Sequence, residues 1–158
     1  MANLAKRVKN NIFKSAGSSF WLKKVLTSSD VLTTASDLTD TATGDLIIEQ
    51  VILATDATGL ATGTNLEISI SGETYGENKP IVEAVSNLGA SVTRSLINTG
   101  PDSTNDRFLS VTGVPFLLEA GAKLQVTSSS ASCTGAGKIA VLIKFSRLQD
   151  NADVKIAG

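Results

Sequence analysis

Apolar and polar residues alternate in two different ways along this chain, and the change occurs near residue 18. Before it, apolar side chains recur every four residues with lysines mainly between them. These are Leu4, Val8 and Ile12, with Phe13 beside them. Because this spacing gathers apolar side chains on one face of a helix, residues 3–15 are predicted to form a short amphipathic helix. Gly17 and the serines around it are predicted to end the helix.

From Phe20 onward the chain consists of short apolar or alternating runs separated by Gly, Ser, Thr, Asp and Asn. No later segment keeps a helical stripe over three turns, which is typical of an all-β protein. The predicted strands are 20–26, 46–54, 65–71, 81–85, 91–98, 108–111, 116–118, 123–128 and 138–148. The predicted fold is a jelly-roll-like antiparallel β-sandwich of eight or nine strands, preceded by a short N-terminal amphipathic helix or arm.

The same pattern predicts which side chains are buried. The strand at 65–71 alternates apolar and polar residues and is expected to be half-buried, whereas the run at 46–53 is expected to be buried on both faces. Trp21 lies inside an apolar strand and is expected in the core. The segment 28–44 is rich in Thr, Ser and Asp, so we expect a long connection that wraps over the surface.

Charge is distributed unevenly along the chain. The first 24 residues hold six basic side chains and no acidic one, whereas the rest hold eight basic and fifteen acidic side chains. The net charge of −1 therefore conceals a basic arm on an acidic body. We expect a basic amphipathic N-terminal arm at 1–18, one β-sandwich domain at 19–150 and a C-terminal tail at 151–158.

The composition argues against catalysis. The chain has no His and a single Cys, which excludes Ser-His-Asp and Cys-His arrangements, the commonest zinc ligand and an internal disulfide. Residues 135–138 resemble part of a phosphate loop, but Ser132 and Ile139 stand where the full pattern needs Gly and Ser or Thr. A carboxylate pair for glycoside hydrolysis is the remaining possibility. We expect no enzyme, no catalytic residue and no cofactor.

Calcium and sugar remain possible ligands, although no sequence motif points to either of them. Asp37, Asp40 and Asp45, with Asp56 from another loop, could supply oxygen ligands for calcium, but their spacing matches no EF-hand. Helix caps and Asx turns explain these residues equally well, so no metal site is predicted. A sugar-binding face would need exposed aromatic rings, and Trp21 and Tyr75 are the only wide amphipathic rings.

The basic arm is the candidate functional element. Contact with nucleic acid is weakly supported, because the arm has neither stacking aromatics nor a recognition motif. Membrane binding is weakly supported, because the apolar stripe is thin. The arm could also fold back on its own body. We favour docking to a protein partner or a neighbouring subunit. The predicted docking residues are Leu4, Lys6, Arg7, Val8, Lys9, Ile12, Phe13 and Lys14.

Targeting signals are also not expected. No apolar run of seven or more residues follows the N-terminal charges, so no secretory signal is predicted. No stretch approaches the roughly 20 apolar residues of a membrane span. We expect a soluble protein made in the host cytoplasm.

The order of the strand and turn segments resembles that of jelly-roll virion structural proteins of tailed phages. These proteins are either capsid decoration or cement proteins or tail-fibre proteins. The segments that carry the resemblance are 51–60, 63–68, 115–126 and 137–148, within residues 45–148. The helical basic arm departs from it. The resemblance implies a non-enzymatic protein located in the virion, with the major capsid protein or another virion protein as partner. It also implies a homo-oligomer, with a trimer favoured.

Two functions follow from these observations. The first is a capsid decoration or cement protein that binds the assembled shell and stabilises it by mass action through oligomeric contacts and the docking arm. The alternative is a receptor- or carbohydrate-binding module of a phage tail or fibre.

Overall fold

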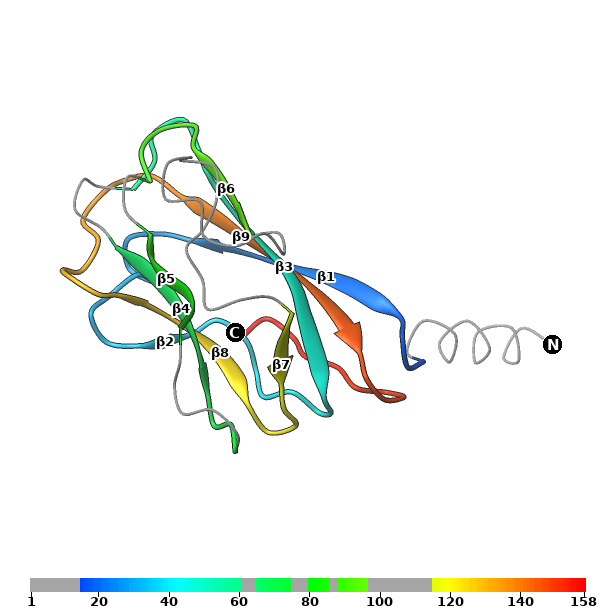
Figure 1. The fold of residues 1–158 in the computed structure, drawn as a ribbon. Coiled ribbons are helices and arrows are strands. Elements are labelled where there is room, and N and C mark those ends of the chain that lie inside the picture. Colours follow the sequence, from blue (N-terminus) through cyan, green and yellow to red (C-terminus); the bar gives the residue numbers. More distant parts are fainter. Residues whose placement is uncertain (1–14, 61–64, 75–79, 86–87, 97–114) are drawn as a thin grey trace.

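A computed structural model describes residues 15–60, 65–74, 80–85, 88–96 and 115–158. The described chain forms two antiparallel sheets, drawn in Figure 1, which enclose one apolar core. The all-β class is therefore confirmed for these residues, and the arrangement is consistent with a β-sandwich. Within the same ranges, no helix is long and apolar enough to cross a membrane.

The first sheet has the strand order β1-β9-β3-β6, and β7 pairs with another part of β3. Its strands are β1 (Ser19–Leu26), β3 (Leu46–Thr55), β6 (Thr93–Leu96), β7 (Phe116–Leu118) and β9 (Ile139–Arg147). The second sheet has the order β2-β8-β4-β5. Its strands are β2 (Ser36–Asp37), β4 (Leu66–Ser71), β5 (Pro80–Val85) and β8 (Lys123–Ser128).

The strands predicted from the sequence agree with the observed bounds to within two residues at each end, wherever the structure describes them. Two predictions, the strand at 108–111 and the helix at 3–15, lie outside the described residues. The two-residue strand β2 was not predicted, because it lies in a segment without an apolar run.

Strand β9 lies between β1 and β3 in the first sheet, and its side chains alternate regularly between the core and the outer face. Ile143 and Phe145 are among the inward residues and are almost fully buried. Phe145 stacks on Phe20 of the neighbouring strand β1, with ring centroids 5.4 Å apart. This packing joins the start of β1 to the core, which matters because the arm precedes β1.

Strand β3 corrects one prediction. It was expected to be buried on both faces, but Ile47 and Ile52 on its outer face are only half-buried. Ile48 and Val51 both face the core although three positions separate them, because a bulge shifts the register after Ile48. The extra residue restores the inward direction of the following apolar side chains.

The segment 28–44 is also different from the prediction, because it does more than wrap over the surface. Leu38 and Thr39 are fully buried, and the amide of Leu38 donates to the carbonyl of Leu124 at 2.8 Å. The Thr39 hydroxyl in turn accepts from the amide of Leu124 at 3.0 Å. The segment thus extends the edge of the second sheet beside β8 (Figure 1). Isolated apolar residues such as Leu38 gave too weak a pattern to predict this.

One end of the sandwich is closed by backbone packing between loops. A Cβ atom placed on Gly137 would overlap the carbonyl oxygen of Gly59, so only glycine fits. Asp56 fixes the same place, because its carboxylate accepts hydrogen bonds from the amides of Thr58, Gly59 and Lys138. These amides, above all that of Gly59, lower the pKa of Asp56. The glycine at 137 therefore serves loop packing before β9.

Candidate functional site

The eight predicted docking residues all lie in residues 1–14, outside the described part of the chain, so they stay a prediction. The structure does describe residues 15–18, which join the arm to strand β1 and which we call the arm root. Its backbone is held at two points. The amide of Gly17 donates to the carbonyl of Arg147 at 2.7 Å, and the amide of Ala16 donates to the Asp150 carboxylate at 2.8 Å.

The arm root also carries its own turn. Gly17 has a φ of 80°, a left-handed conformation that glycine adopts without steric cost. The Ser18 hydroxyl donates to the carbonyl of Ser15 at 2.6 Å. The segment predicted to follow the arm is therefore a hydrogen-bonded turn rather than a loose linker.

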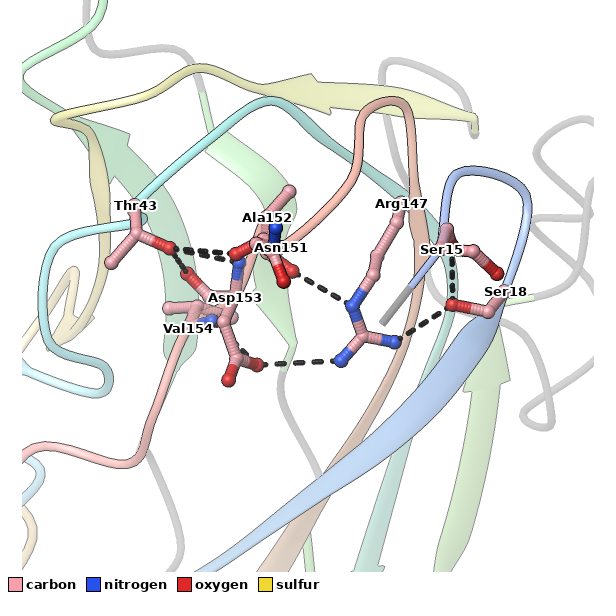
Figure 2. Close-up of polar contacts among 8 residues, drawn as sticks. All are labelled: Ser15, Ser18, Thr43, Arg147, Asn151, Ala152, Asp153 and Val154. Carbon is pink, nitrogen blue, oxygen red and sulfur yellow. Dashed lines mark hydrogen bonds and ion pairs between the residues drawn. The ribbon is translucent and has the colours of Figure 1, made fainter. Parts of the chain in front are cut away.

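Arg147 contacts the arm root. It is the most buried charged side chain among the described residues, with 5% of its surface exposed. Figure 2 shows its guanidinium between Ser18 of the arm root and residues 152–153 of the C-terminal segment. Nε donates to the carbonyl of Ala152 at 2.7 Å, and one terminal nitrogen donates to the Ser18 hydroxyl at 3.1 Å. The other terminal nitrogen pairs with the Asp153 carboxylate at 3.5 Å. The guanidinium also lies over the ring of Phe20, 4.1 Å from its centroid.

The segment that Arg147 holds on its other side is itself tied to the body. Thr43 and Asp153 exchange hydrogen bonds, since the amide of Thr43 donates to the Asp153 carbonyl and the Thr43 hydroxyl accepts from the Asp153 amide. The contacts of Thr43 are drawn in Figure 2. Thr39 also forms a β-bridge with Ile156. Arg147 thus connects the arm root, the C-terminal segment and the edge of the second sheet.

Sequence reasoning missed Arg147, although a signal was present. The inward positions of β9 follow a strict period of two through Ile143 and Phe145, and continuing it by one step places Arg147 on the buried face. A cation at such a position needs several acceptors, because burying an unpaired charge is costly. The strand alternation alone could therefore have identified this residue as a structural centre.

Trp21 was expected in the core, and this expectation is wrong. Its side chain is 47% exposed, because the inward positions of β1 are occupied by Phe20 and Leu22. Trp21 lies opposite Lys144 of β9, which forms an ion pair of 2.6 Å with Glu49 of β3. That ion pair and a hydrogen bond from Ser146 lower the pKa of Glu49. The outer face of the first sheet therefore presents an indole ring beside a charged pair.

The aspartates considered for calcium do not come together. Asp37 pairs with Lys123 at 2.7 Å and accepts a hydrogen bond from Gln125, and these two contacts lower its pKa. Asp45 instead caps the amide of Ala120. In the part of the chain that the structure describes, no group of three His, Cys, Asp or Glu side chains could hold a metal ion.

An open cleft of about 820 Å³ lies between the edge of the second sheet and the C-terminal segment. Its charged lining residues are Asp37, Asp40, Asp153, Lys123 and Lys155. Asp37 and Asp153 are already engaged with Lys123 and Arg147. The cleft therefore offers mixed charge without a concentrated site for an ion.

Comparison with known proteins gives similarities to solved structures only. No family model matches the chain, and no curated protein matches it. A chain in the capsid of Ralstonia phage GP4 is 16% identical, with 84% of this chain and 86% of that chain covered and a TM-score of 0.45. A chain in the capsid of Helicobacter pylori bacteriophage KHP30 is 11% identical, with coverages of 88% and 94% and a TM-score of 0.39. A chain in the cyanophage Pam1 capsid is 12% identical, with coverages of 82% and 84% and a TM-score of 0.38.

Proposed function

We propose that this chain is a non-enzymatic structural protein of a virion, specifically a capsid decoration or cement protein. It binds the assembled shell through its basic N-terminal arm and acts as a homo-oligomer, with a trimer favoured. Its partner is the major capsid protein or another virion protein, and it is made in the host cytoplasm before it joins the particle. A protein that binds only the assembled shell stabilises that state by mass action.

The observation that carries this proposal is the fixed arm root. A flexible tether would leave the arm free to search a large volume, which makes ordering on binding costly. Here the backbone of Ala16 and Gly17 is bonded to the body, and Arg147 holds Ser18 from below. A fixed root gives the arm a defined starting point on the body, which suits docking into a preformed site on a large particle.

Charge supports the same partner class. The first 24 residues carry only basic charges and the remainder is net acidic, so the arm can be attracted to an acidic groove while the body stays separate from it. The apolar residues between the lysines would then supply the contact that holds the arm. Phosphate binding would need the charges but not the apolar stripe.

The test is a truncation that removes residues 1–14 and keeps the arm root. Shells assembled from the major capsid protein of the same virus are mixed with the full chain or with the truncated body, and binding is measured by co-sedimentation. We expect the truncated body to fold normally and to lose most of its shell affinity. A matched control is the full chain with Leu4, Val8, Ile12 and Phe13 changed to Ser, which keeps every charge. Full-affinity binding by the truncated body would contradict the docking role of the arm.

The second candidate function, a receptor- or carbohydrate-binding module, is favoured by one observation. The exposed ring of Trp21 lies beside the Lys144–Glu49 pair, and an aromatic face flanked by hydrogen-bonding groups suits a sugar ring. A glycan array with the wild-type chain and a Trp21→Ala variant tests it. Glycan binding that the variant loses would favour this function over shell binding.

A further inference from the structure

Strand β1 is an end strand of the first sheet, because β9 is its only partner among the described strands (Figure 1). It is eight residues long and contains no Pro, no Gly and no register shift. A long regular edge strand presents a row of unpaired backbone groups to any other strand. Soluble proteins usually shorten, bend or cover such an edge, so the open edge of β1 needs an explanation.

The register identifies which backbone groups of β1 have no partner strand among the described residues. The amide of Arg147 donates to the carbonyl of Ser18, so alternate residues of β9 counted back from Arg147 direct their backbone groups at β1. Their partners on β1 include Phe20, Leu22 and Lys24. The residues between these direct their N–H and C=O groups away from β9. This open-edge set consists of Ser19, Trp21, Lys23 and Val25.

The same four residues also point their side chains away from the core. Trp21 and Val25 are 47% and 48% exposed, and Lys23 lies between them. The edge therefore combines free backbone groups, two apolar side chains and one cation. The aromatic ring and the ammonium group are two residues apart. When two copies of this strand run antiparallel, the ring of each copy can therefore lie opposite the ammonium group of the other copy.

We propose that the occupant of this edge is strand β1 of a second copy of this chain, paired antiparallel about a two-fold axis at Leu22. In this register each Trp21 lies opposite Lys23 of the other copy, and each Ser19 lies opposite Val25. All four open-edge residues find partners, and two cation–π pairs form. The contact is isologous, so it joins two single copies or two larger oligomers edge to edge.

Other registers leave part of the edge unused. An axis at Lys23 sets the two ammonium groups against each other and requires the backbone of Thr27, whose amide already donates to Asp30. An axis at Trp21 requires the backbone of Gly17, whose amide already donates to Arg147. Only the register centred on Leu22 pairs the whole open edge without breaking an existing hydrogen bond.

One strand pair is a small interface, so the contact is weak between free copies and becomes effective when many copies are held side by side. This inference rests on the homo-oligomer of the proposed function but not on shell binding. Loss of shell binding with the β1 contact intact would overturn the proposed function alone.

The test is a register-specific disulfide between two single variants, Trp21→Cys and Lys23→Cys. Residues directly opposite on antiparallel strands lie within disulfide range. We expect the mixture of the two variants to form the mixed disulfide under mild oxidation, and Lys23→Cys alone to form little dimer. The wild-type chain is the background control, because its single Cys133 is buried.

A second measurement does not depend on cysteine. Lys23→Pro removes an N–H that points away from β9, so the β1–β9 ladder stays intact while edge pairing is blocked. Sedimentation velocity over a concentration range should show about tenfold weaker association for Trp21→Ala and no β1-dependent association for Lys23→Pro. Leu148→Ala is the matched control, since Leu148 is 52% exposed but lies beyond β9 and away from this edge.

Three results would overturn the inference. The first is equal disulfide formation by Lys23→Cys alone and by the mixture, which would show that the proposed register is wrong. The second is unchanged association in Lys23→Pro with its fold intact by circular dichroism. Retention of the wild-type chain on a saccharide column through Trp21, without any mixed disulfide, would assign this face to a sugar instead.

Discussion

Replacing Arg147 with Met tests whether one buried cation fixes the arm root to the body. Met keeps much of the length and the apolar stem but removes the charge and all donors. The Ala152 carbonyl and the Ser18 hydroxyl then lose bonds of 2.7 and 3.1 Å, and Asp153 loses its ion-pair partner. The contact over the Phe20 ring is lost as well.

The magnitude follows from the burial of these groups. Breaking a buried ion pair by removing one partner costs about 3–5 kcal/mol. Each hydrogen bond to a charged group contributes about 1.5–3 kcal/mol, but the bond to Asp153 at 3.5 Å is long and falls at the low end. We therefore expect Arg147→Met to lower the free energy of unfolding by about 3–5 kcal/mol. A domain of this kind has about 5–15 kcal/mol in total, so the variant should still fold.

The assay is urea unfolding followed by the fluorescence of Trp21, the only tryptophan. With a slope of about 2 kcal/mol per molar urea, the midpoint should fall by about 2 M. Arg147→Lys is the matched control, because it keeps the charge but cannot reach all three acceptors, and it should lie between wild type and Arg147→Met. Hydrogen exchange should show faster exchange of the Ala16 and Gly17 amides in Arg147→Met. A loss of less than about 1 kcal/mol in the free energy of unfolding, with these amides still protected, would refute the idea that Arg147 fixes the arm root to the body.

Two further predictions concern the loops and pH. Gly137→Ala should lower the urea midpoint strongly or prevent folding because its Cβ would meet backbone, whereas Gly89→Ala has open space and should change stability little. The pKa values of Asp37, Glu49 and Asp56 are lowered in the folded state, so these carboxylates stabilise the protein above their unfolded pKa of about 4. That stabilisation should be lost as pH falls through the lower folded values. Because the chain has no His, stability measured by urea unfolding should be nearly constant from about pH 5.5 to 7.5, and a marked change there would contradict this assignment.

The strands could be predicted because the local alternation of apolar and polar residues determines them. Which face of a strand is covered by the rest of the protein could not be predicted in the same way. The apolar alternation in β4 gave the correct strand and the correct inward face, whereas the apolar run of β9 gave the strand alone. In β1 the same period gave the strand but not the fate of Trp21, since the pattern identifies two faces without saying which one is covered. The topology decides this, because β1 is an end strand of its sheet and Trp21 lies on the outer side.

The segment 28–44 shows a second limit of sequence reasoning. Its partners lie far away along the chain, at Leu124 and in the C-terminal segment, and its contacts are largely backbone hydrogen bonds. Backbone pairing leaves no signature in side-chain polarity, so a Thr- and Ser-rich strand looks like a loop. The docking residues in 1–14 stay a prediction from spacing and charge.

Two adjacent lysines, Lys23 and Lys24, show which of the N-terminal basic side chains remain available for docking. The Lys24 ammonium donates to the carbonyls of Asp37 and Ala157, both at 3.1 Å, so this charge connects the two sheets and is not available for docking. The side chain of Lys23 lies on the opposite, exposed face of β1. The basic charges that remain for the arm itself are the four in residues 1–14, and they lie mainly between the apolar residues that recur every four positions. These apolar residues are the reason why we propose a protein groove rather than a phosphate backbone as the partner of the arm, since a phosphate backbone offers no apolar surface to residues at every fourth position.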